Sequence, residues 1–198
     1  MAKLLDRLSK EMTGLGLTQR TPPARAWLKT QLKTLSNPRQ AIMRNKKCRT
    51  TRCVIGRMYF YYYDPKTKDT LPYYDRFPLV IPIERYGDGF LGLNLHYLPP
   101  NLRLLLLDKL YDLLNNDCFD QSTKLRMTYS LLSNASRYKE FKPCIKRYLY
   151  SHLRSNFIEI PADQWEIAIF LPTEQFVKAK AKTVHKDSRA IIKGARLR

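Results

Sequence analysis

The stretch Cys-Val-Ile-Gly-Arg-Met-Tyr-Phe-Tyr-Tyr-Tyr, residues 53–63, is dominated by aromatic and β-branched residues, which favour a central β-strand. Phe-Pro-Leu-Val-Ile-Pro-Ile, residues 77–83, predicts a second strand. Its prolines, Pro78 and Pro82, have the same parity, so both can face away from the ladder, which favours an edge strand. Residues 86–97 begin with Tyr-Gly-Asp-Gly, a strong hairpin turn, and continue as a third strand. These segments predict a three-stranded antiparallel meander.

Helical patterns flank the predicted meander on both sides. Apolar spacing, with proline at helix starts and glycine or proline at helix ends, predicts helices at 2–13, 23–35, 38–45, 100–115, 121–134, 143–155 and from 173–175 to about 192. We also expect an extended basic linker at 44–52, a short strand at 157–160 and a helical turn around Trp165. Strands followed by helices favour the α+β fold class, here a small antiparallel β-meander packed against several helices, with basic helical N- and C-terminal arms.

The net charge of +19 is confined to the two ends of the 198-residue chain. Residues 1–58 carry 14 Lys and Arg against 2 acidic residues, a net +12, whereas residues 59–175 carry 14 of each sign. Residues 176–198 carry 8 basic residues against Asp187, a net +7. We therefore predict a basic helical N-terminal arm, an α+β core and a basic C-terminal helix or tail, at 1–50, 51–172 and 173–198.

Two basic arms on a neutral body are suited to gripping a polyanion, because neutralising phosphates releases counterions and supplies affinity that does not depend on sequence. A solvated surface that binds nothing is the alternative, but solubility alone does not need +19. An anionic membrane fits poorly, since the basic segments lack a large apolar opposite face with Trp and Phe anchors. The predicted DNA-binding residues are Arg44, Lys46, Lys47, Arg49, Arg52, Lys178, Lys182, Lys186, Arg189, Lys193, Arg196 and Arg198.

Cations of the C-terminal segment recur at helical spacing. Steps of three or four residues bring side chains to one face of a helix, so these cations predict a single stripe. Its members are Lys178, Lys182, Lys186, Arg189 and Lys193. Like charges at this spacing weaken an isolated helix, and a polyanion along the stripe would relieve the repulsion. An exposed helix that binds nothing is the alternative.

Residues that could hold a metal are scattered. The cysteines stand at 48, 53, 118 and 144, and the histidines are His96, His152 and His185. A structural zinc site normally shows two close pairs, and only one pair is present, so we expect inert, reduced thiols and neither metal nor cofactor. No apolar run approaches the ~20 residues of a membrane span, and charges near the N-terminus are unlike those of a signal peptide.

One acidic cluster imitates a nuclease. Glu140-Phe141-Lys142, with Asp117 and Asp120 upstream, has the spacing of a Mg²⁺-dependent nuclease motif. That motif belongs on a β-hairpin, whereas Pro143 is expected to open a helix here. Phosphate-binding glycine loops and the common hydrolase motifs are missing from the sequence. We therefore predict no catalytic residue and no enzyme.

The aromatic block at 59–63, with Tyr73 and Tyr74, allows two interpretations. Alternate rings could stack on exposed bases, as in single-strand binders. Alternatively, one face packs against the leucine-rich helices. Packing is favoured because the block lies in the neutral region, whereas a stacking platform is expected beside cations.

Several distinctive strings resemble one known family. They are Tyr59 to Lys66, Leu71 to Val80, Gly87 to Asn94, His96 to Pro99, Glu140 to Lys146 and Lys186 to Arg189. They are similar to strings in the DNA end protector proteins of T-even-like contractile-tailed phages, and the resemblance spans roughly residues 53–192.

The resemblance implies a late, non-enzymatic virion protein that binds the ends of packaged linear double-stranded DNA. It would complete the filled head near the portal and neck, and shield the ends from host exonuclease in the host cytoplasm after ejection. Its partners would be double-stranded DNA and phage head, neck or tail proteins in a multi-subunit assembly. Two alternatives stay open: a structural neck, tail or baseplate component whose basic arms bind neighbouring virion subunits, and a Mg²⁺-dependent nuclease that uses Glu140.

Overall fold

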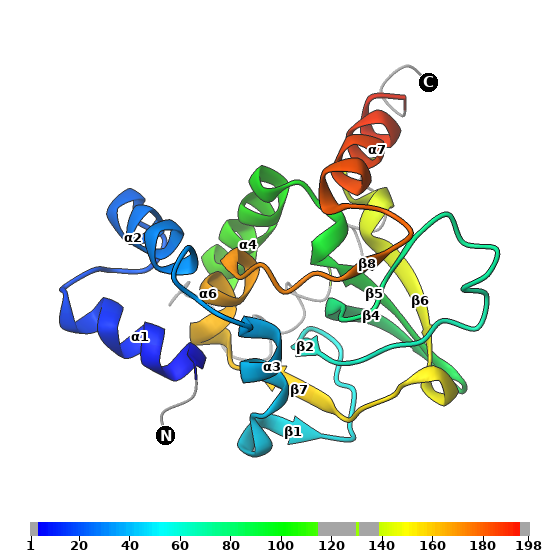
Figure 1. Cartoon of the computed structure of the whole chain (residues 1–198), viewed down its shortest axis with the longest axis horizontal. Helices are drawn as coiled ribbons and strands as arrows, with labels where there is room; N and C mark the ends of the chain where they lie inside the picture. Colours follow the sequence, from blue (N-terminus) through cyan, green and yellow to red (C-terminus); the bar gives the residue numbers. More distant parts are fainter. Residues whose placement is uncertain (1–3, 115–129, 131–138, 195–198) are drawn as a thin grey trace.

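The computed structural model describes residues 4–114, residue 130 and residues 139–194. They form a six-stranded antiparallel sheet in the order β1-β7-β2-β4-β5-β6, a second sheet of β3 and β8, and helices packed around both (Figure 1). The strands are β1 Arg49–Thr50, β2 Met58–Phe60, β3 Tyr74–Asp75, β4 Leu79–Tyr86, β5 Gly89–Asn94, β6 Ile145–Leu149, β7 Phe157–Ile160 and β8 Phe176–Val177. The predicted α+β fold class is confirmed.

The predicted meander forms the middle of the large sheet. Tyr59 of β2 lies opposite Val80 of β4, and Val80 lies opposite Asn94 of β5. β7 pairs with the other edge of β2, which confirms the short strand predicted at 157–160. β2 itself is shorter than predicted, because only three residues of 53–63 pair in the ladder.

β4 is an interior strand, so the edge strand predicted from Pro78 and Pro82 is wrong. Of the β4 residues, only Leu79 and Val80 pair with β2, which ends before it reaches Pro82. The Pro82 carbonyl instead accepts a hydrogen bond from the Gly56 N–H at 3.0 Å. The nitrogen and the carbonyl of a strand residue point to the same side, so the Pro82 nitrogen also faces the region beyond the end of β2. No ladder hydrogen bond is lost there.

The helix predicted at 143–155 is wrong, since this segment contains β6, which pairs with β5 along its whole length. Tyr148 of β6 is buried, and its ring stacks on Phe90 at a centroid distance of 5.3 Å. The sequence pattern of this segment fits either a helix or a strand. Pairing with the free edge of β5 and packing in an aromatic cluster favour the strand. The helix predicted at 121–134 lies outside the described residues except for Ser130.

Four predicted helices, at 2–13, 23–35, 38–45 and 100–115, are confirmed, and so is the turn around Trp165. The α-helices are α1 Leu4–Gly14, α2 Pro22–Leu32, α3 Pro38–Met43, α4 Pro100–Leu114, α6 Trp165–Phe170 and α7 Ala181–Gly194. The 3₁₀ helices are η1 Lys46–Cys48, η2 Leu95–Tyr97, η3 Lys139–Cys144, η4 Tyr150–His152 and η5 Ala162–Gln164. Within the described residues, no helix has the length and hydropathy needed to span a bilayer.

The core lies on both faces of the sheet. Met58 and Phe60 face the larger cluster, to which the helices contribute, whereas Tyr59 and Tyr61 face the opposite side. This alternation follows from the two-residue period of a strand. The second cluster is mainly aromatic and consists of Cys53, Tyr59, Tyr61, Tyr63, Val80, Phe90, Tyr148 and Phe157. The packing interpretation of the aromatic block is therefore confirmed.

An ion-pair network fixes α2 to the rest of the molecule. Glu166 of α6 is fully buried and accepts hydrogen bonds from the Arg25 Nε and the Arg20 N–H, both at 2.7 Å. Arg25 also donates to Asp108 of α4 at 2.6 Å. The N-terminal helices share the larger core with the sheet, and the predicted division of the chain at residues 50 and 172 stays a prediction.

The last helix begins later than predicted. Thr173 is expected from the sequence to lie at its N-terminus, but α7 begins at Ala181. The Thr173 hydroxyl lies 3.0 Å from the His96 Nε2, and the two residues of β8 pair with β3. The Thr173 side chain, which resembles a helix cap in the sequence, thus contacts His96, a residue distant in the sequence.

Gly89 is required by the close approach of β6. A Cβ atom at this position would overlap the carbonyl oxygen of Tyr148, which is backbone and cannot rotate away. We therefore expect Gly89→Ala to destabilise the protein by about 1–3 kcal/mol in urea unfolding. Gly87→Ala is the matched control, because nothing lies within 4 Å of its Cβ position. Equal stability of the two variants would contradict the predicted clash.

Candidate nucleic-acid interface

The basic segment at 44–52 is folded onto the sheet. The extended linker predicted there is wrong in part, because η1 and β1 occupy most of it. Asn45 is buried and caps η1 by accepting the Cys48 N–H at 3.3 Å, while β1 pairs with β7 through Arg49 opposite Ile158. This geometry presents the side chains of Arg44, Lys46, Lys47, Arg49 and Arg52, all of which are exposed. None of them forms a salt bridge with another described residue.

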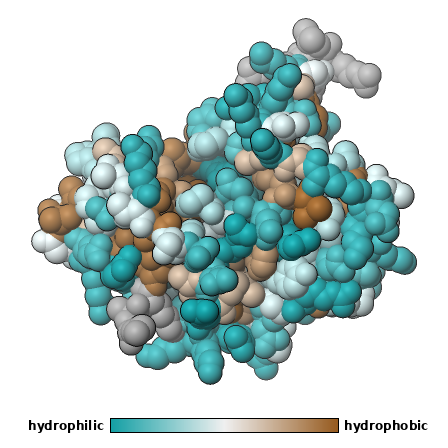
Figure 2. Space-filling model, in the orientation of Figure 1, coloured by the Kyte–Doolittle hydropathy of each residue, from teal (hydrophilic) through white to brown (hydrophobic). Residues whose placement is uncertain are grey.

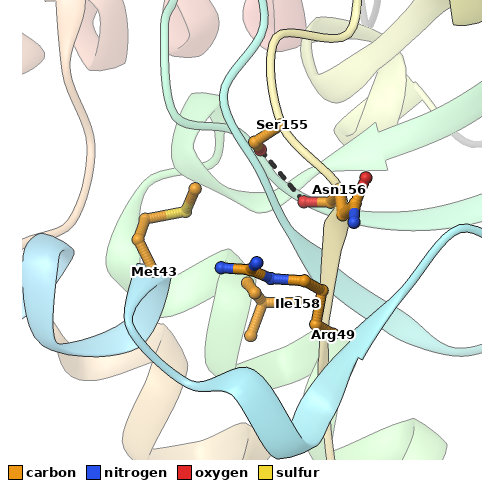
Figure 3. A pocket seen from close by; sticks show the side chains of 5 residues that line it. All are labelled: Met43, Arg49, Ser155, Asn156 and Ile158. Atoms are coloured by element: carbon orange, nitrogen blue, oxygen red, sulfur yellow. Dashed lines mark hydrogen bonds between the residues drawn. The ribbon is translucent and has the colours of Figure 1, made fainter.

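A groove lies between α3, β1 and the loop that leads into β7. One part of it is a hollow of about 240 Å³ lined by Met43, Arg49, Ser155, Asn156 and Ile158. In Figure 3 the Arg49 side chain extends over Ile158 and its guanidinium points toward Met43. Adjoining hollows share Gln40, Met43 and Arg49 on one side and Ser155 and Asn156 on the other. We call these four hollows, which share lining residues, the basic groove.

The described residues that line the basic groove include cations and amides but no acidic side chain. They are Asn37, Pro38, Arg39, Gln40, Met43, Arg44, Lys46, Arg49, Thr51, Phe77, Leu153, Arg154, Ser155, Asn156, Phe157, Ile158 and Gln175. An anion in this groove would therefore meet cations and neutral donors only. Because the cations are solvent-exposed, each contact would be weak alone and salt-dependent.

Arg154, Ser155 and Asn156 are groove residues that the sequence does not predict. The pairing of β1 with β7 brings them beside the basic segment, from more than 100 positions away. Arg154 also donates to an Asp64 carboxylate oxygen at 3.4 Å. The sequence predicts β7 as a strand, but it contains no signal for β1 or for the pairing of the two strands.

One end of the basic groove is built differently. Here the Arg39 guanidinium lies 5.5 Å from the centroid of the Phe77 ring and donates to the Gln175 Oε1 at 2.7 Å. The Arg39 Nε is buried and has no hydrogen-bond partner. Phe77 is half-buried and stacks on Tyr62 at 5.2 Å with an interplanar angle of 19°.

α7 carries the second basic surface. Val184, Ser188 and Ile192 form its buried face, and the Ser188 hydroxyl donates to the Tyr97 carbonyl at 2.8 Å. The His185 Nε2 lies 2.9 Å from the His96 carbonyl. The opposite face exposes the cationic side chains of Lys182, Lys186, Arg189 and Lys193, which form no ion pair with any described residue.

Lys178 lies apart from this cationic face, so its predicted place on the helical stripe is wrong. Its φ is 68°, which is incompatible with a right-handed helix. The ammonium donates to the carbonyls of Lys68 and Asp69 at 2.8 Å and of Leu71 at 3.1 Å. Lys178 thus fixes the loop after β2. Arg196 and Arg198 lie outside the described residues.

The predicted DNA-binding residues therefore form two separate surfaces. In Figure 1 β1 lies at the lower edge of the molecule, whereas α7 extends from its upper right. Hydrophilic residues cover most of the face in Figure 2, and hydrophobic residues gather mainly at its left, over α1 and α2. Within the described part of the chain, the basic segment at 44–52 and α7 do not meet in one site.

Residues 8–189 match the sequence model of the family described as phage T4 terminal DNA protecting protein. The chain belongs to this family of phage DNA protecting proteins. Searches of curated proteins and of solved structures gave no significant match. The family match extends over α2, the basic segment at 44–52 and α7 as far as Arg189, so it includes the first basic surface and all of the second except Lys193.

This DNA protecting protein contains a buried group that resembles a catalytic triad. The His96 Nδ1 lies 2.6 Å from the Asp75 Oδ2, and the His96 Nε2 faces the Thr173 hydroxyl. His96 and Thr173 are each only 1% exposed, so this arrangement gives a substrate no access to the hydroxyl. Burial opposes ionisation of Asp75, but the charge and hydrogen bond of His96, with hydrogen bonds from Gln175 and Asn94, lower its pKa below the ordinary 3.8.

The thiols of Cys53 and Cys144 and the imidazole of His152 have structural roles in this DNA protecting protein. Burial raises the pKa of Cys53 and of Cys144 to about 12, which keeps both thiols protonated and unreactive. The His152 Nδ1 lies 2.9 Å from the Asp64 carbonyl. Among the described residues no three His, Cys, Asp or Glu side chains converge as metal ligands would.

The nuclease alternative rests on side chains that the structure does not describe. Asp117, Asp120 and the Glu140 side chain lie outside the described residues. Lys142 belongs to η3 and not to the β-hairpin that such a motif needs. The family is named for protecting DNA and not for a catalysed reaction.

Proposed function

We propose that this phage protein is a non-enzymatic virion component that binds the ends of packaged linear double-stranded DNA near the portal and neck. There it shields the ends from host exonuclease, in the particle and in the host cytoplasm after ejection. The observation that carries the proposal is the basic groove, whose cations have no acidic neighbours among its lining residues. A DNA-protecting family supports the same conclusion.

The chemistry of the groove suits DNA ends. Phosphates occur at every end whatever its sequence, and a protein that guards all ends has to rely on charge and shape. In the proposed complex the groove contacts the terminal nucleotides through Arg44, Lys46 and Arg49, and the exposed Lys47 and Arg52 of the same basic segment contact phosphates beside it. The exposed cations of α7 then contact the adjoining duplex.

Exonuclease protection tests this proposal. The purified protein is expected to slow the digestion of linear duplex DNA, and a variant with Arg44→Gln, Lys46→Gln and Arg49→Gln should need about tenfold more protein or greater for equal protection. The matched control removes the same charge elsewhere, through Lys10→Gln, Lys29→Gln and Lys66→Gln. Full protection by the groove variant, or equal protection of internal sites from an endonuclease, would reject end binding at the groove.

A structural role in the neck, tail or baseplate is the second candidate. α7 projects from the body in Figure 1, and Ile191 on the same helix is 47% exposed. A helix that exposes cations and an aliphatic side chain also suits an acidic groove of a neighbouring virion subunit. This role predicts that neutralising the α7 cations abolishes incorporation into particles while exonuclease protection by the purified protein is unchanged.

A further inference from the structure

We propose that the basic groove receives a single-stranded DNA terminus, with the last unpaired base stacked at its Phe77 end. The inference rests on the proposed DNA binding and specifies which form of DNA the groove recognises. It commits to a strand whose phosphates follow Lys46, Arg44 and Arg49 toward Arg39.

The two ends of the basic groove differ in chemistry. Near β1 it offers Arg49, Ser155 and Asn156, which are a cation and neutral polar groups suited to phosphates. At the other end the hollow of about 460 Å³ is lined by Phe77 and Arg39, by the apolar Pro38 and Met43, and by neutral polar side chains. This volume is within the range of small-molecule sites, about 300–1,000 Å³. A ligand with an anionic backbone and a flat apolar ring at its end matches both.

The Phe77 end is prepared for stacking. Phe77 already stacks on Tyr62 at 5.2 Å and on Phe60 at 6.1 Å, and the Arg39 guanidinium lies over its ring. Phe60 is fully buried, and its packing fixes the position of this stack. Unpaired bases stack on aromatic rings and on guanidinium planes, whatever their identity. A base bound at this end of the groove would thus add one more ring to an existing stack.

Two hydrogen-bonding side chains at the same end have donors or acceptors without a partner among the described residues. The Arg39 Nε is buried without a partner, and the exposed Gln40 side chain has no hydrogen bond to a described residue. A buried donor without a partner is unfavourable, so a ligand acceptor at this point adds binding energy. A base within a duplex keeps acceptors on its groove edges but cannot bring them into the Phe77 end, because its faces are stacked on neighbouring bases. An unpaired terminal base can.

A set of DNA ends tests the inference. One duplex sequence is prepared with hairpin-closed ends, with blunt ends, and with short single-stranded tails of either polarity. We expect a tail of the preferred polarity to raise affinity by about tenfold or more over the closed duplex, since stacking one base contributes an effect of this size. Equal affinity for the tailed and closed duplexes would overturn the inference while leaving DNA binding intact. No binding to any of them would reject the proposed function itself.

Two groove variants make the test specific to the Phe77 end. Phe77→Leu keeps an apolar side chain of similar size, and Gln40→Ala changes an exposed residue that cannot disturb folding. Both are expected to bring the ratio of tailed-duplex to closed-duplex affinity close to one, and Phe77→Tyr should retain the wild-type ratio. Lys182→Gln with Lys186→Gln is the control, which should weaken tailed and closed duplexes equally. Persistence of the tail preference in both groove variants would overturn the inference.

Discussion

The Asp75→Ala variant is expected to lose about 3–5 kcal/mol of folding free energy, the largest loss that we predict for a single substitution. Asp75 is 4% exposed and accepts hydrogen bonds from His96, from Asn94 and from the backbone N–H groups of Phe77 and Gln175. Removing the carboxylate leaves the His96 imidazole and the Phe77 and Gln175 N–H groups without this acceptor, while Asn94 keeps only its hydrogen bond to the Tyr148 hydroxyl. For a chain of this length the melting temperature should fall by about 6–20 °C.

A surface ion pair provides the control for Asp75→Ala. Glu159 pairs with Arg57 at 2.8 Å, and their side chains are 30% and 56% exposed. Glu159→Ala should therefore cost only about 0–1 kcal/mol. If calorimetry found the two variants equally stable, the buried network around Asp75 would not be the main source of stability at the junction of β3, η2 and β8.

Acid should reduce the contribution of Asp75 specifically. Its pKa is lowered in the folded protein, so its stabilising effect is present above the ordinary value of 3.8 and is lost as the pH falls through the lowered pKa. Melting curves of the wild type and of Asp75→Asn, taken from about pH 6 to about pH 2, should converge at the acid end. A constant difference across this range would contradict the lowered pKa.

The fold could be predicted where the decisive interactions are local. The meander follows from strand composition and from the turn at Gly87, and Thr21 before two prolines marks the start of α2, whose Ala24 N–H its hydroxyl accepts. β6 and the start of α7 could not be predicted in the same way. Their conformations depend on the free edge of β5 and on the contact between Thr173 and His96, and each joins segments distant in the sequence.

The candidate site was predictable in its charge but not in its shape. The basic residues around Arg49 stand out in the sequence, whereas the groove exists only because β1 pairs with β7 and brings Ser155 beside them. Lys178 shows the opposite case. It has the spacing of the α7 cations, but a left-handed backbone conformation turns it toward three carbonyl groups.

The salt dependence of DNA binding measures how many of these cations contact phosphates. A groove variant extended to the flanking Lys47 and Arg52, with Arg44, Lys46, Lys47, Arg49 and Arg52 all replaced by Gln, should flatten the slope of log affinity against log salt by up to about 4.5. Between about 50 and 200 mM salt the wild type would then lose about 500-fold more affinity than the variant. The equivalent α7 variant, with Lys182, Lys186, Arg189 and Lys193 replaced by Gln, should flatten the slope by up to about 3.6.

The comparison of the two variants decides between one surface and two. If both surfaces contact one DNA molecule, each variant has a flatter slope and the combined variant shows the sum of both changes. A scattered control variant, with Lys10, Lys29, Lys66, Arg85 and Lys142 replaced by Gln, removes as much charge as the groove variant from exposed positions elsewhere. An equal change in the scattered control would show that net charge alone governs binding. An unchanged slope in the α7 variant would assign DNA binding to the groove and leave α7 for a protein partner.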